Sequence, residues 1–407
     1  MDKPLSGVKV LELATFVAAP ACARLLSDLG AEVIKVEHPK GDGWRFVGVN
    51  FIPSRFSDSE NPVFDIYNAG KKHIAIDLKS EKGKETFHKL LQWADVFVTN
   101  SRPAALHRLG IAYEDIKEQY PSLIYGIILG YGEKGPDAAK PAYDTTAYWS
   151  RSGFLRDMAV NNEAYMPVNA PSSIGDTTCA YLLLAEICAA LYRRKETGKG
   201  DYLRSGLLHN TIFSMGTMQI ITQRPFGNKY PKTRAEYGSP NGAFCCADGD
   251  WIFIAAGTGA DVLPKVCQMI GRPELLEDPR FSTLQARRQN HQVWYEIFRE
   301  ALLQKTLPEW LALGEQLDIP MTRMGTFADL SEDEQAWAND YLEHVEFPSG
   351  NVDVMPRSPI EMDSVGLPHT RIAPAVGADT RQILAQVGYT ENEINEMLAA
   401  GAVAETK

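Results

Sequence analysis

The sequence predicts an α/β protein in which a doubly wound, Rossmann-like parallel sheet forms a large domain, joined to a smaller α+β domain. Strand-like and helix-like patterns alternate over roughly the first 130 residues, as is typical of β-α-β units. A stretch rich in Pro, Gly, Asn, Lys and Tyr at residues 224–241 separates them from a second set of helices. At 407 residues, the chain is long enough for two domains with full cores.

The first predicted β-α-β unit covers residues 8–36. Residues 8–13 alternate like a strand, residues 21–29 indicate a helix that ends at Gly30, and residues 33–36 indicate the next strand. The turn between strand and helix has no GxGxxG motif, so a nicotinamide cofactor is not supported.

The alternation continues with strands expected at residues 73–78, 95–99 and 123–129 and helices at 81–92, 103–109 and 113–119. Ligands of doubly wound sheets bind at the carboxyl ends of the strands. Four turns should therefore meet at a site, at residues 16–18, 37–40, 100–102 and 130–133.

Further along, residues 179–192 indicate a buried helix, 201–204 a strand and 207–221 another helix. A hairpin is expected at residues 245–255 and a strand at 350–359. Helices are expected at 260–270, 289–303, 307–317, 379–386 and 391–399. We therefore assign residues 1–221 to the large domain, 222–241 to a linker, 242–330 to the small domain and 331–378 to a return linker. Residues 379–407 should complete the large domain.

Composition excludes several classes of protein. A net charge of −11 argues against nucleic-acid binding, and no apolar window resembles a signal peptide or a membrane span. The six cysteines lack CxxC spacing and the histidines lack paired spacing, so we expect free thiols, a cytoplasmic location and no metal site. Basic residues gather in the first quarter of the chain, which suits a phosphorylated cofactor: Lys35, Lys40, Arg45, Lys71, Lys72, Lys79, Arg102 and Arg108.

Asp176 lies at the start of the apolar helix, and basic residues 193–195 lie at its end. An aspartate there can be an N-cap that satisfies free amides. It can also be a carboxylate nucleophile that the helix N-terminus keeps ionised, with Gly175 allowing a large substrate close to the backbone. Both interpretations fit the local sequence.

The order of several motifs resembles the class III CoA-transferases over nearly the whole chain. They are LSGVKVLE at 5–12, GAEVIKVE at 30–37, ADVFVTN at 94–100, Gly175-Asp176, TGKG at 197–200, and residues 377–380 and 388–389. The chain is most similar to the branch that transfers CoA to (R)-2-hydroxy acids such as phenyllactate or 2-hydroxyisocaproate. That similarity rests on residues 12–14, 18–21, GYGEKGPD at 130–137 and EQAWANDYL at 334–342.

The resemblance implies that Asp176 is the nucleophile, and Gly175 and Glu133 are candidates for the same catalytic centre. The implied contacts to CoA are Val17, Ala18, His38, Lys40, Ile76, Lys79, Asn100, Ser101 and Arg108. Leu129 departs from members with a lysine there, so Lys40, Lys79 and Arg108 are the candidate phosphate-binding cations. Residues 237–243 show no clear counterpart of a glycine-rich flap. The aromatic residues Phe16, Tyr143 and Tyr148 are candidates for an acyl pocket, although such residues are also common in cores.

The reaction implied is transfer of CoA from a 2-enoyl- or 2-hydroxyacyl-CoA to a carboxylic acid through an aspartyl mixed anhydride, with CoA as substrate and without a metal. Oxyanion donors are expected among the amides near Gly175 or in the turn at 130–132. Carnitine and bile acids remain open as acceptors. A 2-methylacyl-CoA racemase of the same fold and a non-catalytic CoA-binding protein are the alternatives. The resemblance also implies an interlocked homodimer in which each chain forms a ring threaded through the other.

Overall fold

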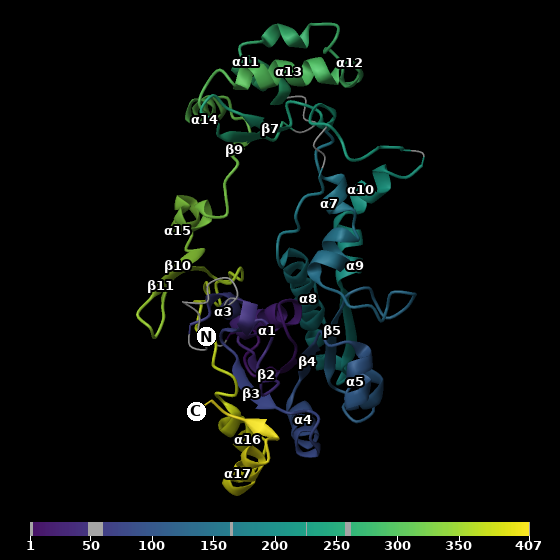
Figure 1. Cartoon of the computed structure of the whole chain (residues 1–407), viewed down its shortest axis with the longest axis vertical. Coiled ribbons are helices and arrows are strands. Elements are labelled where there is room, and N and C mark those ends of the chain that lie inside the picture. The colour runs from purple at the N-terminus through teal and green to yellow at the C-terminus, as the bar shows by residue number, and fades with distance from the viewer. Residues whose placement is uncertain (1–2, 48–59, 163–165, 225, 257–261, 407) are drawn as a thin grey trace. The chain divides into compact units, whose positions relative to one another are not determined.

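The computed structural model describes residues 3–47, 60–162, 166–224, 226–256 and 262–406. The chain forms two compact units (Figure 1). The first contains Met1–Ser152, Ala170–Thr217 and Ser331–Lys407, and the second contains Gly153–Asn169 and Met218–Leu330. The chain therefore leaves the first unit and later returns to it.

A seven-stranded sheet organises the first unit. The strand order is β12-β3-β2-β1-β4-β5-β6, and all neighbours are parallel except β12, which pairs antiparallel with β3. The order reverses between β1 and β4, which is the point where doubly wound sheets bind ligands. The strands are β1 (Lys9–Leu13), β2 (Glu32–Glu37), β3 (Lys72–Ile76), β4 (Val96–Thr99), β5 (Ile124–Leu129), β6 (Asp201–Gly206) and β12 (Val403–Ala404).

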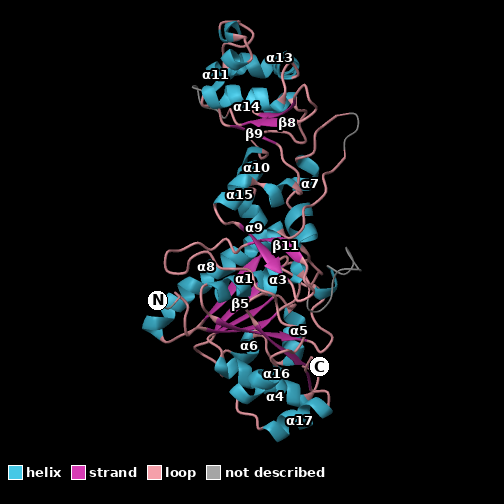
Figure 2. Cartoon of the chain, turned by 90° about the vertical axis from the view of Figure 1, so that its left-hand side faces the viewer, coloured by secondary structure: helices cyan, strands magenta, loops and turns pink. Residues whose placement is uncertain are grey.

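Helices cover both faces of this sheet (Figure 2). On one face, α1 (Ala18–Asp28) packs between the strands, α3 (Pro62–Asn68) and α8 (Ile174–Thr197). The apolar core of the other face joins strand residues to helices from both ends of the chain. These helices are α4 (Glu81–Trp93), α5 (Pro103–Leu109), α6 (Tyr113–Ile116), α16 (Thr380–Gln386) and α17 (Glu391–Ala399).

Local sequence explains why these elements form. All six residues of β5 are buried, as expected of a strand covered on both faces. Helix α4 begins after Ser80, whose hydroxyl accepts the Gly83 amide at 3.0 Å. Helix α1 is almost entirely buried because its many alanines allow close packing between the sheet and α8.

Helix α8 is 24 residues long and is apolar enough to pass a length-and-composition test for a membrane span, which core helices of soluble proteins also pass. Only 39% of its apolar window is buried. Within the first unit, exposed apolar side chains lie on α8 and on α9 (Leu207–Ser214): Ile174, Tyr181, Leu182, Tyr192, Ile212 and Phe213. This set is called the α8–α9 face below.

The second unit contains the antiparallel sheet β7 (Gly242–Cys245), β8 (Trp251–Ile254) and β9 (Met321–Arg323). Its core holds Trp294, Phe298 and Trp310. The helices in or bordering this unit are α7 (Phe154–Asp157), α10 (Gly216–Ile221), α11 (Val262–Met269), α12 (Leu284–Gln289), α13 (His291–Leu302) and α14 (Leu307–Gln316). The returning segment adds α15 (Glu334–Ala338) and the hairpin of β10 (Leu342–Glu346) and β11 (Val352–Pro356) to the first unit.

The structure differs from the sequence prediction at several points, including residues 331–378, which were expected to be a return linker but contain α15, β10 and β11 of the first unit. The helix expected at 207–221 is two helices, α9 and α10, which meet at Met215. The helix expected at 289–303 begins at His291, and α12 precedes it. Residues 153–169 belong to the second unit, since the Asn161 amide donates to the Lys232 carbonyl at 2.9 Å.

Candidate active site

A pocket of about 290 Å³ lies at the strand-order reversal of the first unit. The segments that follow β1, β4 and β5 form most of its wall, and α8 contributes Asp176. Its described lining is Thr15, Phe16, Val17, Ala18, Asn100, Ser101, Arg102, Pro103, Ile128, Leu129, Gly130, Tyr131, Gly132, Ala138, Lys140, Pro141, Ala142, Tyr143, Asp176 and Leu207. Three of the four turns expected at the site therefore meet there.

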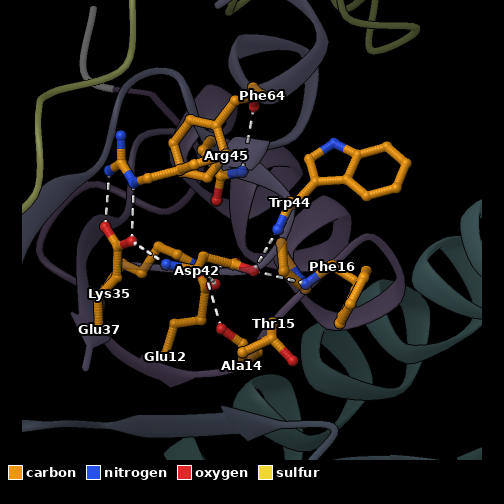
Figure 3. A network of polar contacts seen from close by, with 12 residues as sticks. Glu12, Ala14, Thr15, Phe16, Lys35, Glu37, Asp42, Trp44, Arg45 and Phe64 are labelled. Atoms are coloured by element: carbon orange, nitrogen blue, oxygen red, sulfur yellow. Dashed lines mark hydrogen bonds and ion pairs between the residues drawn. The ribbon is translucent and has the colours of Figure 1, made fainter. Parts of the chain in front are cut away.

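The turn after β1 is fixed by polar contacts from two neighbouring segments. Asn100 accepts the Thr15 amide at 3.1 Å and donates to the Thr15 carbonyl at 2.7 Å. Asp42 accepts the Phe16 amide at 3.1 Å (Figure 3). The adjoining residues Val17 and Ala18 then begin α1 with buried side chains. Asn100 thus shapes the pocket wall through the backbone of Thr15.

Asp176 lies in the first turn of α8 and faces the pocket. Burial, with a further contribution from the nearby Asp144 carboxylate, raises the pKa of Asp176 to about 7. The sequence-based expectation that the helix N-terminus keeps Asp176 ionised is therefore wrong. Near neutral pH the free carboxyl is partly protonated.

Asp144 explains why the helix N-terminus does not favour Asp176. It belongs to a π-helical turn, η1 (Asp144–Ser150), is 5% exposed, and accepts the Trp149 indole N–H at 3.2 Å. Burial raises the pKa of Asp144, and the indole and the amides of Ser173, Gly175 and Asp176 partly offset that effect. These amides lie close to the Asp144 carboxylate.

Gly175 is needed for packing against η1. A Cβ at this position would overlap the Asp144 carboxylate and the Tyr148 side chain. The expectation that Gly175 opens the backbone to substrate is wrong where its Cβ would point, because atoms of Asp144 and Tyr148 already fill that space. Tyr148 is 4% exposed and is absent from the described pocket lining, so it supports the first turn of α8 from behind.

The turn after β5 approaches the pocket closely. A Cβ on Gly130 would overlap Ala142, so glycine lets residues 141–143 fold over the strand end. Gly132 has a φ of 92°, in the region that favours glycine. The turn at 130–132 lines the pocket and is therefore a candidate source of oxyanion donors. Glu133 points elsewhere, since it accepts the Tyr202 hydroxyl and pairs with Arg204.

The predicted site residues divide into two groups. Seven line the pocket: Phe16, Val17, Ala18, Asn100, Ser101, Tyr143 and Asp176. The others are absent from its described lining: Glu133, Gly175, His38, Lys40, Ile76, Lys79, Arg108 and Tyr148. Ile76 is 1% exposed at the end of β3, and His38 accepts the Lys40 amide at 3.0 Å within its own turn. Arg108 lies in the last turn of α5, the opposite end from the pocket.

Two cations that were not among the predicted CoA contacts line the pocket, Arg102 and Lys140, although Arg102 belongs to the basic residues noted in the first quarter of the chain. Arg102 directly follows Asn100 and Ser101 at the end of β4 and is the N-cap residue of α5. Its position directly after these two predicted contacts was sufficient to predict that Arg102 also lies at the site. Lys140 lies in the irregular segment after β5, pairs with Asp137 at 2.6 Å, and had no comparable signal.

Within the described residues, no group of three His, Cys, Asp or Glu side chains could hold a metal ion. The pocket instead offers one carboxylate, two cations and apolar or aromatic surface. This arrangement suits a nucleophile and an anionic ligand with an apolar portion.

Residues 5–380 match CoA-transferase family III. The chain belongs to this family. The resemblance inferred from the sequence motifs is therefore confirmed, and the protein is a CoA-transferase with acyl-CoA as substrate.

Two relatives match the chain over nearly its full length. An (R)-2-hydroxy-4-methylpentanoate CoA-transferase from Clostridioides difficile is 43% identical over 96% of this chain and 97% of that protein. A cinnamoyl-CoA:phenyllactate CoA-transferase from Clostridium sporogenes is 38% identical over 96% of this chain and 95% of that protein.

Solved structures share the fold. A CAIB/BAIF family protein from Brucella suis has a TM-score of 0.78 at 28% identity and covers 95% of this chain and 100% of that one. A hypothetical protein (Rv3272) from Mycobacterium tuberculosis has a TM-score of 0.80 at 27% identity and covers 94% and 99%.

Proposed function

We propose that this family III CoA-transferase moves CoA from an acyl-CoA to a 2-hydroxy acid with an apolar side chain, and that Asp176 is the nucleophile. The observation that carries the proposal is the position of Asp176 in a pocket that also holds Arg102, Lys140, Phe16 and Tyr143. The names of the two relatives described above support this class of acceptor.

Covalent catalysis accounts for the carboxylate. An Asp176 oxygen attacks the thioester carbonyl, the carbon–sulfur bond breaks, and CoA leaves as a thiolate that stays bound. The carboxylate of the incoming acid attacks the Asp176 carbonyl of this mixed anhydride, the donor acyl group leaves as a free carboxylate, and a new anhydride joins Asp176 to the acceptor acid. The thiolate then attacks the carbonyl of the new acyl group, forms its thioester and releases the Asp176 carboxylate.

The raised pKa of Asp176 serves this role. Burial disfavours the carboxylate relative to water, so the ionised form is more basic and more nucleophilic than an exposed aspartate. The turn at Gly130–Gly132 can supply amides to the oxyanion that forms at the thioester carbonyl. The anhydride must be kept from water, which requires that bound substrate cover the pocket.

The side-chain chemistry of the pocket favours an apolar acid. Phe16, Tyr143, Ile128, Leu129 and Leu207 offer aromatic or aliphatic surface next to Asp176. Leu129 stands where some family members have a lysine, so the pocket wall is less cationic there. Among the described lining residues there is no histidine to act with Asp176 in a racemase.

We infer that Arg102 and Lys140 contact the phosphates of CoA. Both line the pocket, whereas the predicted cations Lys40, Lys79 and Arg108 are absent from its described lining. Guanidinium and ammonium groups bind phosphate through charge-assisted hydrogen bonds.

We also propose that the protein is a homodimer, with the α8–α9 face buried against a second copy. Phe213 is 86% exposed and Tyr192 is 71% exposed, and they lie on two helices that contact each other. Large exposed apolar patches mark interfaces. The family resemblance supports the interlocked form, and the chain connectivity between two units is compatible with it.

Chemical trapping tests the nucleophile. Incubation with a donor acyl-CoA and hydroxylamine should convert one aspartate, Asp176, to a hydroxamate that peptide mass spectrometry locates. Asp176→Ala should lower CoA transfer at least about 1,000-fold while CoA still binds. Asp201→Ala is the matched control, because Asp201 pairs with Arg193 and is absent from the pocket lining.

A hydroxamate at another residue, or an active Asp176→Ala variant, would contradict covalent catalysis by Asp176. Exchange of deuterium from heavy water into the α-carbon of a 2-methylacyl-CoA, without transfer to any acid, would instead favour the racemase.

A further inference from the structure

Phe16 combines an unfavourable backbone conformation with a place in the pocket wall. Its φ is 63°, in the left-handed region that non-glycine residues rarely occupy. Such a conformation persists only where surrounding contacts hold it. Phe16 lines the pocket beside Asp176, so whatever holds its backbone also fixes part of the binding surface.

Asp42 holds the backbone of Phe16 in this conformation (Figure 3). One carboxylate oxygen, Oδ1, accepts the Phe16 amide at 3.1 Å and the Trp44 amide at 3.0 Å. Asp42 is 2% exposed, so water does not compete for these amides. A single acceptor atom therefore links the turn after β1 to the turn after β2.

Lys35 fixes Asp42 from the other side. Its ammonium lies 3.0 Å from Asp42 Oδ2 and 2.7 Å from Glu12 Oε1, and all three side chains are fully buried. The same ammonium donates to the Ala14 carbonyl at 3.0 Å. Two neighbouring backbone positions of the turn, Ala14 and Phe16, are thus tied to one buried ionic cluster.

The Phe16 ring is packed on three sides. Its centroid lies 5.7 Å from that of Tyr143, which also lines the pocket, and 6.2 Å from that of Trp44, both edge-to-face. On the third side is Gly43, where an added Cβ would lie 3.2 Å from Phe16 Cζ. The position of the ring therefore depends on the turns that Asp42 joins.

We propose that Asp42 is a positioning residue that sets the side-chain selectivity of the pocket by holding Phe16 in its left-handed conformation. This proposal rests on the proposed function, because the selected group is the apolar side chain of the acid. Phe16 provides the surface that recognises that side chain, and Asp42 acts on the substrate only through Phe16.

The test is a competition between two acceptors in one mixture, 2-hydroxy-4-methylpentanoate and the smaller lactate, with one donor acyl-CoA. The product ratio gives the ratio of the two kcat/KM values and does not depend on the fraction of folded enzyme. Phe16→Gly removes the ring at a position whose φ suits glycine, and should lower the preference for the larger acid about tenfold or more.

Asp42→Ala and Asp42→Asn form a matched pair. Both remove the charge beside Lys35, but only asparagine keeps an Oδ1 acceptor for the two amides. Asp42→Ala should lower the preference about as much as Phe16→Gly, and Asp42→Asn should stay within about threefold of the wild type. In the Phe16→Gly background, Asp42→Ala should change the preference little further.

Equal product ratios for Asp42→Ala and Asp42→Asn, or additive effects in the double variant, would overturn the proposal. If Asp42→Ala does not fold, Gly43→Ala decides, since its Cβ would lie 3.2 Å from Phe16 Cζ and should shift the ring slightly without touching the ionic cluster. An unchanged ratio in that variant contradicts the proposal. Failure of the wild type to transfer CoA to either acid would instead contradict the proposed function.

Discussion

At the scale of single residues, Asp176 and Asp144 have opposite relations to the same helix end. The nearby amides of the first turn of α8 partly offset the effect of burial on the pKa of Asp144. Burial and the neighbouring Asp144 carboxylate both raise the pKa of Asp176. Neither carboxylate makes a side-chain cap hydrogen bond to α8, so the cap that was one interpretation of Asp176 is not formed. The nearby Asp144 carboxylate instead helps to keep Asp176 basic.

The pKa of Asp176 predicts how activity depends on pH. Attack on the thioester needs the ionised carboxylate, so kcat/KM with saturating acceptor should rise about tenfold per pH unit below pH 7 and level off above it. A pH series with one donor acyl-CoA measures this. A flat profile between pH 5 and 8 would show that Asp176 stays ionised over this range and that burial does not raise its pKa in the free enzyme.

The raised pKa of Asp176 also predicts that the folded protein loses stability as the pH rises, whereas its activity increases. Between about pH 4 and 7 the folded state binds the Asp176 proton more tightly than the unfolded state, so this contribution to stability is lost as pH rises through 7. Asp176→Asn cannot ionise and should be more stable than the wild type at pH 8, by roughly 1–3 kcal/mol after allowance for partial solvent contact.

At pH 4 or below, where the unfolded chain also begins to hold this proton, the two proteins should unfold at nearly the same temperature. Thermal unfolding at both pH values checks the difference. Equal stability at pH 8 would mean that the folded protein does not disfavour the Asp176 carboxylate.

At the scale of elements, helix α5 provides an internal comparison for CoA binding. Arg102 precedes its first turn and lines the pocket, and Arg108 lies in its last turn. Six residues of helix separate them by about 9 Å along the axis. The sequence favoured Arg108 as a phosphate contact, whereas the structure places Arg102 in the pocket wall.

Arg102→Gln should therefore weaken CoA binding by about tenfold or more, and Arg108→Gln should have little effect, because a charge-assisted contact contributes roughly 1.5–3 kcal/mol. Calorimetric titration with CoA, dephospho-CoA and pantetheine checks this. Pantetheine should bind both variants equally well. Equal weakening of all three ligands by Arg102→Gln would show that Arg102 contacts no phosphate.

The sequence predicted regular elements better than the irregular ones that complete the site. Residues 8–13 and 123–129 carry apolar patterns strong enough to indicate strands, and both strands lie in the sheet. The π-helical turn at Asp144–Ser150 has no sequence periodicity that would indicate it, because its form depends on contact with Gly175. Asp42 was missed for a similar reason, since its role arises where two separate turns meet.

At the scale of the whole molecule, the α8–α9 face predicts association. Apolar side chains as exposed as Phe213 and Tyr192 are costly in water, so we expect a dimer of twice 45.1 kDa. Sedimentation at nanomolar concentration should show no dissociation, because obligate interfaces commonly exceed about 2,000 Å². A folded, active monomer at that concentration would refute the dimer.

Phe213→Asp should disrupt the dimer if the α8–α9 face forms the interface, whereas Phe327→Asp is the control. Phe327 is 89% exposed but lies in the second unit. Persistence of the dimer with Phe213→Asp would place the interface elsewhere, and loss with both substitutions would show that the effect is not specific to the α8–α9 face.

The pairing of β12 with β3 has a consequence for synthesis of the chain on the ribosome. The Ala75 amide meets Thr380, 305 positions later, and β12 follows further still. At translation rates of about 5–20 residues per second, β3 waits roughly 15–60 s for these partners. During that interval its edge and the apolar residues that α16 and α17 later cover are open to other nascent chains. Newly made protein therefore passes through a period of vulnerability to aggregation that the finished enzyme does not share.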